Sequence, residues 1–145
     1  SKGVIAGGST TATRNALTFY ECVFSAWQRL PFVQDGAIAD IVNCVYPNID
    51  RIDAIEVADS GEARARASVF RNSTDGSHAW ETRNLGGGYI AEGPEANDYQ
   101  NSANFTEVSP SQVFSVPYSL TVNTTAYVDA NVESNVGAGS VIIPE

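Results

Sequence analysis

The sequence predicts an all-β fold in which short parallel strands stack as successive turns of a solenoid. Segments 17–24, 39–46 and 63–70 share one pattern and begin 22 and then 24 residues apart. A period in this range with short strands is typical of solenoids, in which each turn, or coil, buries a shared interior against the next. Within the third segment alanine alternates strictly with arginine, which is the two-residue period of a strand and not the 3.6-residue period of a helix.

Stacking the three segments brings like residues together. Phe24 lies over Tyr46, and Tyr46 over Phe70, with neighbours separated by the strand spacing of about 4.8 Å. The alternation directs Arg64 and Arg66 outward on one sheet face while the intervening alanines point inward. The two arginines either line a groove that binds sugar or form a solvated face that discourages aggregation.

The same register places Cys22 over Cys44, and Cys44 over Ser68. The strand spacing lies within the range of Cα separations that a disulfide can bridge, so a Cys22–Cys44 bond between adjacent coils is predicted if the two Cβ vectors converge. The alternative is a pair of buried thiols in an internal ladder that Ser68 continues. Neither interpretation makes a cysteine a nucleophile.

The pattern is less regular beyond the third segment. The three glycines and apolar residues of 86–90 predict one more irregular coil, and the polar stretch 97–106 predicts a loop. Segment 116–122 is expected to be extended, and a short helix is expected over 129–135.

We therefore expect a single domain over residues 1–145, with coils over 1–96 and a loop and returning C-terminal tail over 97–145. The tail is expected to lie across the side of the solenoid or to cover its end, because exposed strand edges invite pairing with other chains.

Composition narrows the function classes. Seventeen acidic and eight basic residues give a net charge of −9, which argues against nucleic-acid binding because that function depends on clustered Lys and Arg. No apolar run approaches the roughly 20 residues needed to cross a bilayer. The chain contains no methionine, so we expect a processed product or an excised piece.

Glycosylation sequons indicate the compartment. Asn72, Asn104 and Asn123 each begin an Asn-x-Ser/Thr triplet in a polar or turn-rich setting. Chance is the alternative in a sequence rich in Asn, Ser and Thr. Three sequons in one short chain favour a eukaryotic, secreted and extracellular glycoprotein.

Several motifs resemble one family in order and spacing. The run 28–36, followed by 41–46, resembles the Arg-x-Pro-x-x-Arg-x-Gly segment and the next coil of family 1 pectate and pectin lyases. Segment 54–70 looks like the following coil, and 116–120 is similar to the closing segment of fungal-type members. The resemblance covers about residues 14–142. It implies the C-terminal portion of a right-handed parallel β-helix.

The resemblance also implies a reaction, the cleavage of polygalacturonate by β-elimination. Arg29 takes the position of the catalytic base, although a guanidinium, with a pKa above about 12, needs surroundings that disfavour its charge. Gln34 falls where the family has a second arginine that contacts a substrate carboxylate, and Ala58 falls near a further one. Calcium is the implied cofactor, with ligands expected on an N-terminal portion outside this chain and none bound by this chain alone.

Other residues are candidates for sugar, catalytic or calcium sites. Trp27 either stacks on a sugar ring or covers the solenoid wall, and the same alternatives apply to Trp80. His78 is expected to be exposed, without a triad. The aspartates lack the compact spacing of a calcium loop and are expected in solvated turns. These aspartates are Asp35, Asp40, Asp50 and Asp53.

Two functions are therefore predicted as alternatives. The first is a lyase acting on pectic polysaccharide, completed by a separate N-terminal chain or by sequence removed in processing. The second is a non-catalytic secreted β-helix with a structural or carbohydrate-binding role, which self-associates through its coil ends.

Overall fold

The computed structural model describes residues 3–7, 15–26, 29–49, 54–71, 80–82, 88–100 and 115–135. In these residues the chain forms three parallel sheets and one helix, α1 (Thr125–Asn135). The first sheet has the order β1 (Ile5–Gly7), β3 (Phe32–Gln34), β6 (Ile55–Val57), β9 (Trp80–Thr82). The second has the order β10 (Tyr89–Glu92), β7 (Glu62–Arg66), β4 (Ile38–Val42), β2 (Ala16–Tyr20). The third has the order β11 (Asp98–Gln100), β8 (Val69–Arg71), β5 (Val45–Tyr46).

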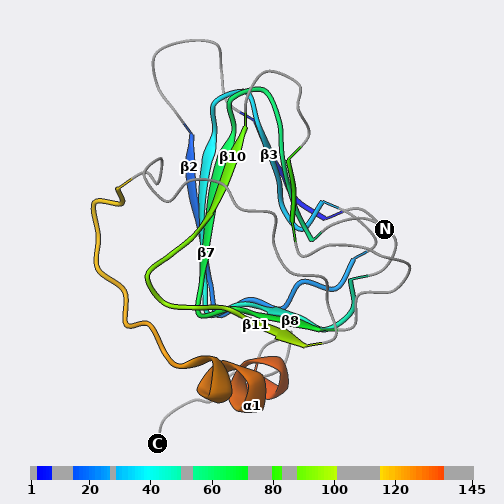
Figure 1. Cartoon of the computed structure of the whole chain (residues 1–145), viewed down its shortest axis with the longest axis vertical. Helices are drawn as coiled ribbons and strands as arrows, with labels where there is room; N and C mark the ends of the chain where they lie inside the picture. Colours follow the sequence, from blue (N-terminus) through cyan, green and yellow to red (C-terminus); the bar gives the residue numbers. More distant parts are fainter. Residues whose placement is uncertain are drawn as a thin grey trace, which may run out of the picture.

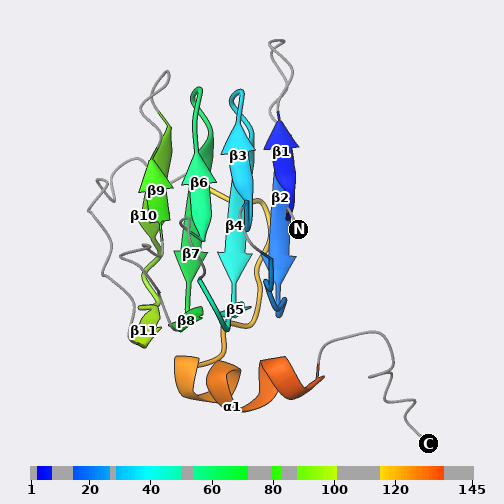
Figure 2. The same cartoon turned by 90° about the vertical axis from the view of Figure 1, so that its right-hand side faces the viewer.

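The chain visits the three sheets in the same order in each repeat. β3, β4 and β5 form one passage, and β6, β7 and β8 form the next, each strand pairing in parallel with its counterpart. Figure 2 shows the strands of the first two sheets side by side in this order. The prediction of a mostly β fold with parallel sheets is confirmed.

Alternation along the second sheet separates core from surface. Ala39 pairs with Ala63 and Ile41 with Ala65, and all four side chains are buried in the main core cluster. Asp40, between the two core positions of β4, faces the outer side of the sheet. The small alanines of β7 therefore point inward as predicted, because successive side chains of a strand point to opposite faces.

Aromatic rings form a continuous column in the core. The ring centroids of Phe24 and Tyr46 lie 5.0 Å apart, those of Tyr46 and Phe70 4.5 Å apart, and both pairs are stacked. Tyr99 of β11 stacks on Phe70 at 5.4 Å. The predicted column is confirmed and continues for one repeat more than predicted. The loop expected over 97–106 is wrong for Asp98–Gln100, which form β11, and residues 101–106 lie outside the described residues.

The corner after the second sheet requires a left-handed backbone in successive repeats. Glu21, Asn43 and Ala67 all have positive φ angles, of 50°, 53° and 44°. Asn43 suits this position because asparagine adopts the left-handed region more readily than most residues. Its side-chain Nδ2 also donates to the Ala67 carbonyl at 3.2 Å and to the Asn123 carbonyl at 2.9 Å, which joins two repeats to the C-terminal tail.

The tail lies across the second sheet and ends in α1 beneath the third sheet (Figure 1). Val128 and Val132 of the helix pack on Val45 and Val69 in a second core cluster. Arg71 adds an ion pair to the helix through Asp129, at 2.7 Å. Within residues 115–135 the tail lies across the side of the sheets, which is one of the two predicted positions. The helix begins at Thr125, before the predicted start at residue 129.

Candidate functional site

Arg29 lies at the entrance to β3. Its backbone is left-handed, with φ of 66°. Hydrogen bonds hold it on both sides, because the Val4 N–H donates to the Arg29 carbonyl at 2.8 Å and the Leu30 N–H donates to the Ala54 carbonyl at 3.0 Å. The guanidinium carbon lies 5.7 Å from the centre of the Phe32 ring, within the range of a cation–π contact. Arg29 is thus fixed in the backbone and carries its cation over an aromatic ring of the first sheet.

Gln34 lies at the other end of β3. Its amide donates to the Asp35 carboxylate at 3.1 Å, and a Cβ built on Gly7 would lie 3.9 Å from the amide nitrogen. Phe32 and Gln34 share the outer face of the first sheet, since Val33 between them is fully buried. Arg29 and Gln34 therefore flank one short strand.

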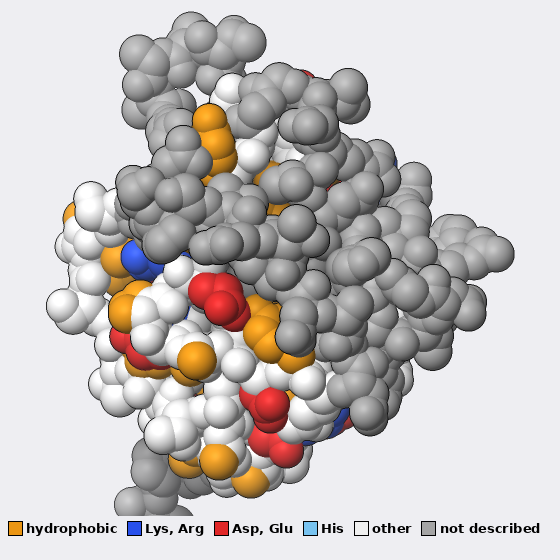
Figure 3. Space-filling model, in the orientation of Figure 1, with side chains coloured by type: hydrophobic (Ala, Val, Ile, Leu, Met, Phe, Trp, Pro, Cys, Tyr) orange, Lys and Arg blue, Asp and Glu red, His pale blue; other side chains and the backbone are white. Residues whose placement is uncertain are grey.

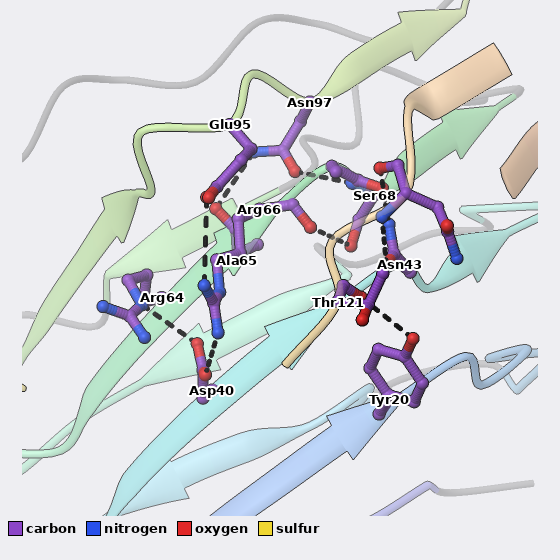
Figure 4. Close-up of polar contacts among 12 residues, drawn as sticks. Tyr20, Asp40, Asn43, Arg64, Ala65, Arg66, Ser68, Glu95, Asn97 and Thr121 are labelled. Carbon is purple, nitrogen blue, oxygen red and sulfur yellow. Dashed lines mark hydrogen bonds and ion pairs between the residues drawn. The ribbon is translucent and has the colours of Figure 1, made fainter. Parts of the chain in front are cut away.

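Arg64 and Arg66 lie elsewhere, on the outer face of β7 in the second sheet. Figure 4 shows both guanidinium groups directed at Asp40. Arg64 Nε donates to Oδ1 of Asp40 at 2.9 Å, and an Arg66 terminal nitrogen donates to Oδ2 at 2.9 Å. Asp40 is 1% exposed and each arginine 9% exposed. The expectation of solvated turns is wrong for Asp40, and neither the sugar groove nor the solvated face predicted for the arginines is what the structure contains.

Segment 115–124 covers this charged cluster. The Tyr118 hydroxyl hydrogen-bonds to Asp40 at 3.2 Å and also to the Thr18 hydroxyl. Next to it, the Tyr20 hydroxyl donates to the Thr121 carbonyl at 2.9 Å. The arginine pair therefore joins the tail to the sheet and is not open to a polymer. Sequence reasoning missed Asp40 as the centre of this cluster, although its register opposite Arg64 could have indicated the pairing.

Cys22 and Cys44 are free thiols in the structure, so the predicted disulfide is corrected to the alternative of two ladder thiols. The stacking prediction itself is confirmed, since the Cys44 N–H donates to the Ser68 hydroxyl at 3.1 Å. A hydrogen bond from the Cys44 thiol lowers the pKa of Cys22 to about 6. Burial raises the pKa of Cys44, which keeps that thiol protonated as the donor.

The sequon residue Asn123 is half-buried at the junction of tail and helix. Its Nδ2 donates to the Glu21 carboxylate at 3.0 Å, and its N–H donates to the Asn43 side chain at 2.9 Å. A glycan on Nδ2 would leave one N–H for Glu21. The remaining predicted candidates Trp27, Asn72, His78 and Asn104, with Asp50 and Asp53, lie outside the described residues.

Within the described residues, no group of three or more His, Cys, Asp or Glu side chains is arranged to hold a metal ion. Asp40 does not suit calcium either, because two guanidinium groups already occupy its carboxylate. The described part of the chain has no helix of the length and apolarity that a membrane span requires.

The sequence does not predict one further feature of the structure. A cavity of about 100 Å³ lies between α1 and the corner that follows β2. Its lining residues are Glu21, Tyr127, Asn131, Val132 and Asn135. Glu21 is more than a hundred positions from the four helix residues in the sequence, and only the docking of the helix brings them together.

The site is thus divided between two sheets. Arg29 precedes β3 and Gln34 ends it, in the first sheet. Arg64 and Arg66 bind Asp40 on the second sheet. Scans against protein-family models and against curated proteins found no match to this chain.

Proposed function

We propose that this chain is part of a right-handed parallel β-helix that cleaves polygalacturonate by β-elimination, with Arg29 as the base. The three parallel sheets, visited in one repeating order, support the β-helix. The observation that carries the function is the placement of an arginine at a left-handed position, φ 66°, over the outer ring of Phe32.

The choice of arginine at this position needs a reason beyond the backbone. A left-handed backbone costs a residue that has a Cβ about 1 kcal/mol of conformational free energy, and glycine, asparagine or aspartate would have a smaller penalty. Strained positions that retain an unfavourable residue are concentrated at functional sites. Glu21 and Ala67 share this backbone region at structural corners, so the strain at Arg29 supports a role for its side chain only together with its position over Phe32 on the outer face of β3.

The elimination requires a base that is both placed and neutral when it acts, so the Arg29 guanidinium must lose its proton before the reaction. The base nitrogen of Arg29 takes the proton from the carbon next to the uronate carboxylate. The electron pair of that C–H bond forms a carbon–carbon double bond, the glycosidic C–O bond breaks, and the leaving oxygen takes a proton from water. The calcium that the family resemblance implies would have its ligands outside the described residues, so no step is assigned to it.

The assay is the growth of unsaturated-uronide absorbance from polygalacturonate, with and without calcium. Arg29→Ala is expected to abolish product formation, at least a hundredfold below the parent chain, which is the usual contribution of a general base. Gln34→Arg restores the second motif cation and is expected to raise activity, whereas Gln34→Ala, the matched control, does not. Equal activity of Arg29→Ala and the parent chain would refute the assignment.

A second candidate is a non-catalytic secreted β-helix that has a structural or carbohydrate-binding role. The burial of Arg64 and Arg66 against Asp40 favours it, because two cations that would bind a polyanion are neutralised within the fold. In this case the natural protein would form no product from polygalacturonate. Native mass spectrometry would distinguish a partner chain from end-to-end association of identical chains, and glycan mapping at Asn72, Asn104 and Asn123 would test secretion.

A further inference from the structure

The cavity beside α1 has a defined shape on one side of the helix. Tyr127, Asn131 and Asn135 are spaced four residues apart, so they lie on one helix face. Glu21, at the left-handed corner after β2, forms the opposite side, and the side chain of Val132 closes the apolar part. The cavity is partly open to solvent.

The lining is suited to hydroxyl groups. Asn131 Nδ2 donates to the Tyr127 carbonyl at 2.8 Å, which orients the amide and leaves its oxygen as an acceptor. The Glu21 carboxylate is oriented by Asn123, at 3.0 Å, and offers further acceptor positions. Tyr127 lines the cavity and is 48% exposed, so its ring is accessible to a ligand there. Amide donors, carboxylate acceptors and an aromatic face together match a ligand that carries both hydroxyls and C–H groups.

Charge restricts the ligand class. Glu21 is the only charged residue among the described residues that line the cavity, and its carboxylate would repel an anion. That charge acts locally, because the pKa of Tyr20 is raised by burial and then by Glu21. Carboxylate side chains also recur over the described part of the face in Figure 3. A uronate is therefore disfavoured, and a neutral ligand is favoured.

Size restricts it further. A cavity of about 150 Å³ holds one benzene molecule, so about 100 Å³ accommodates part of a single six-membered ring. The helix that forms one wall is anchored by buried Val128 and Val132 and by the contacts of Arg71 with Asp129, which provides the rigid support that a binding site needs.

We propose that this cavity binds one neutral hexopyranose ring, with Glu21 and Asn131 bonded to ring hydroxyls and Tyr127 against the C–H face. The site is separate from Arg29 and acts whether or not the chain has lyase activity. In a chain that contacts plant or microbial polysaccharide it would recognise a neutral sugar beside the acidic ones.

The test is titration of the ¹⁵N-labelled full chain with methyl β-D-galactopyranoside, followed by amide shifts. Galacturonate and methylammonium serve as the anionic and cationic probes. The expected result is saturable shifts confined to Glu21, Tyr127, Asn131 and Asn135, with dissociation constants in the millimolar range. Tyr127→Ala is expected to weaken binding about tenfold, the upper range for loss of one aromatic contact. Ala130→Ser, on an exposed helix position outside the cavity, should leave binding unchanged.

A second variant covers the case in which Tyr127→Ala changes the helix. Glu21→Gln keeps the shape and removes the charge, so it should retain galactoside binding within about threefold and relieve the exclusion of galacturonate. The absence of saturable shifts with the parent chain would overturn the proposal. Stronger binding of galacturonate or of methylammonium than of the galactoside would overturn it as well.

Discussion

Replacement of Asp40 by asparagine tests whether the charged cluster is structural. Asparagine has nearly the same shape, but it removes the charge that two buried guanidinium groups share at 2.9 Å each. Asp40 is 1% exposed, so water cannot replace the lost carboxylate. Leaving buried cations without their partner costs about 3–5 kcal/mol. This is a large part of the total stability of a small domain, about 5–15 kcal/mol.

Urea unfolding followed by circular dichroism measures this loss. Asp35→Asn is the matched control, because Asp35 is exposed in a left-handed turn where asparagine is equally suitable. The control is expected to change the free energy of unfolding by less than about 0.5 kcal/mol. Adding Arg66→Met to Asp40→Asn should recover part of the loss, because it removes one of the two guanidinium groups that bonded to the lost carboxylate.

Similar small losses for Asp40→Asn and Asp35→Asn would refute the reasoning. They would mean that the tail opens readily and that Arg64 and Arg66 are solvated, which would return the arginine pair to consideration as a sugar-binding face.

Three further predictions concern the core and the helix. Cys22 should react with iodoacetamide at pH 7, above its pKa of about 6, and more slowly as the pH falls below 6. Cys44→Ala should slow the reaction at pH 7 several-fold, since the Cys44 thiol is the main cause of the low pKa of Cys22. Tyr46→Phe should raise the free energy of unfolding by about 1 kcal/mol in urea titration, because the fully buried hydroxyl has no hydrogen-bond partner among the described residues. Arg71→Ala should destabilise the chain by about 1 kcal/mol and accelerate hydrogen exchange in α1, since it loses the partly exposed ion pair with Asp129. A Cys22 reaction rate that is independent of pH, a destabilised Tyr46→Phe variant, or unchanged exchange in Arg71→Ala would each contradict the corresponding argument.

The repeat period predicted much of the fold because packing between parallel stacked repeats is nearly local. Each repeat contacts its neighbours through matching positions, so aligning the segments of the sequence was sufficient to stack Phe24, Tyr46 and Phe70. Alternation was sufficient to direct the alanines of β7 inward and its arginines outward.

The outer surfaces were less predictable, because what covers them comes from distant parts of the chain. The sequence places Arg64 outward, but not beneath Tyr118, which is folded back over the sheet from the C-terminal tail. The polar composition after residue 96 predicts a loop, whereas Asp98–Gln100 form β11. The reason is that Tyr99 stacks on Phe70 and so continues the aromatic column.

The sequence by itself determined the mostly β class, the parallel stacking and the inward or outward direction of the alternating alanines and arginines of β7, since these follow from periods of 2 and of about 22 to 24 residues. Only the tertiary structure decided which outward residues remain available for ligands. The tail buries Asp40 and its two arginines, and the docked helix encloses the cavity beside Glu21. The physical reason is that burial of a surface residue depends on contacts between segments far apart in the chain, and no short-range pattern encodes them.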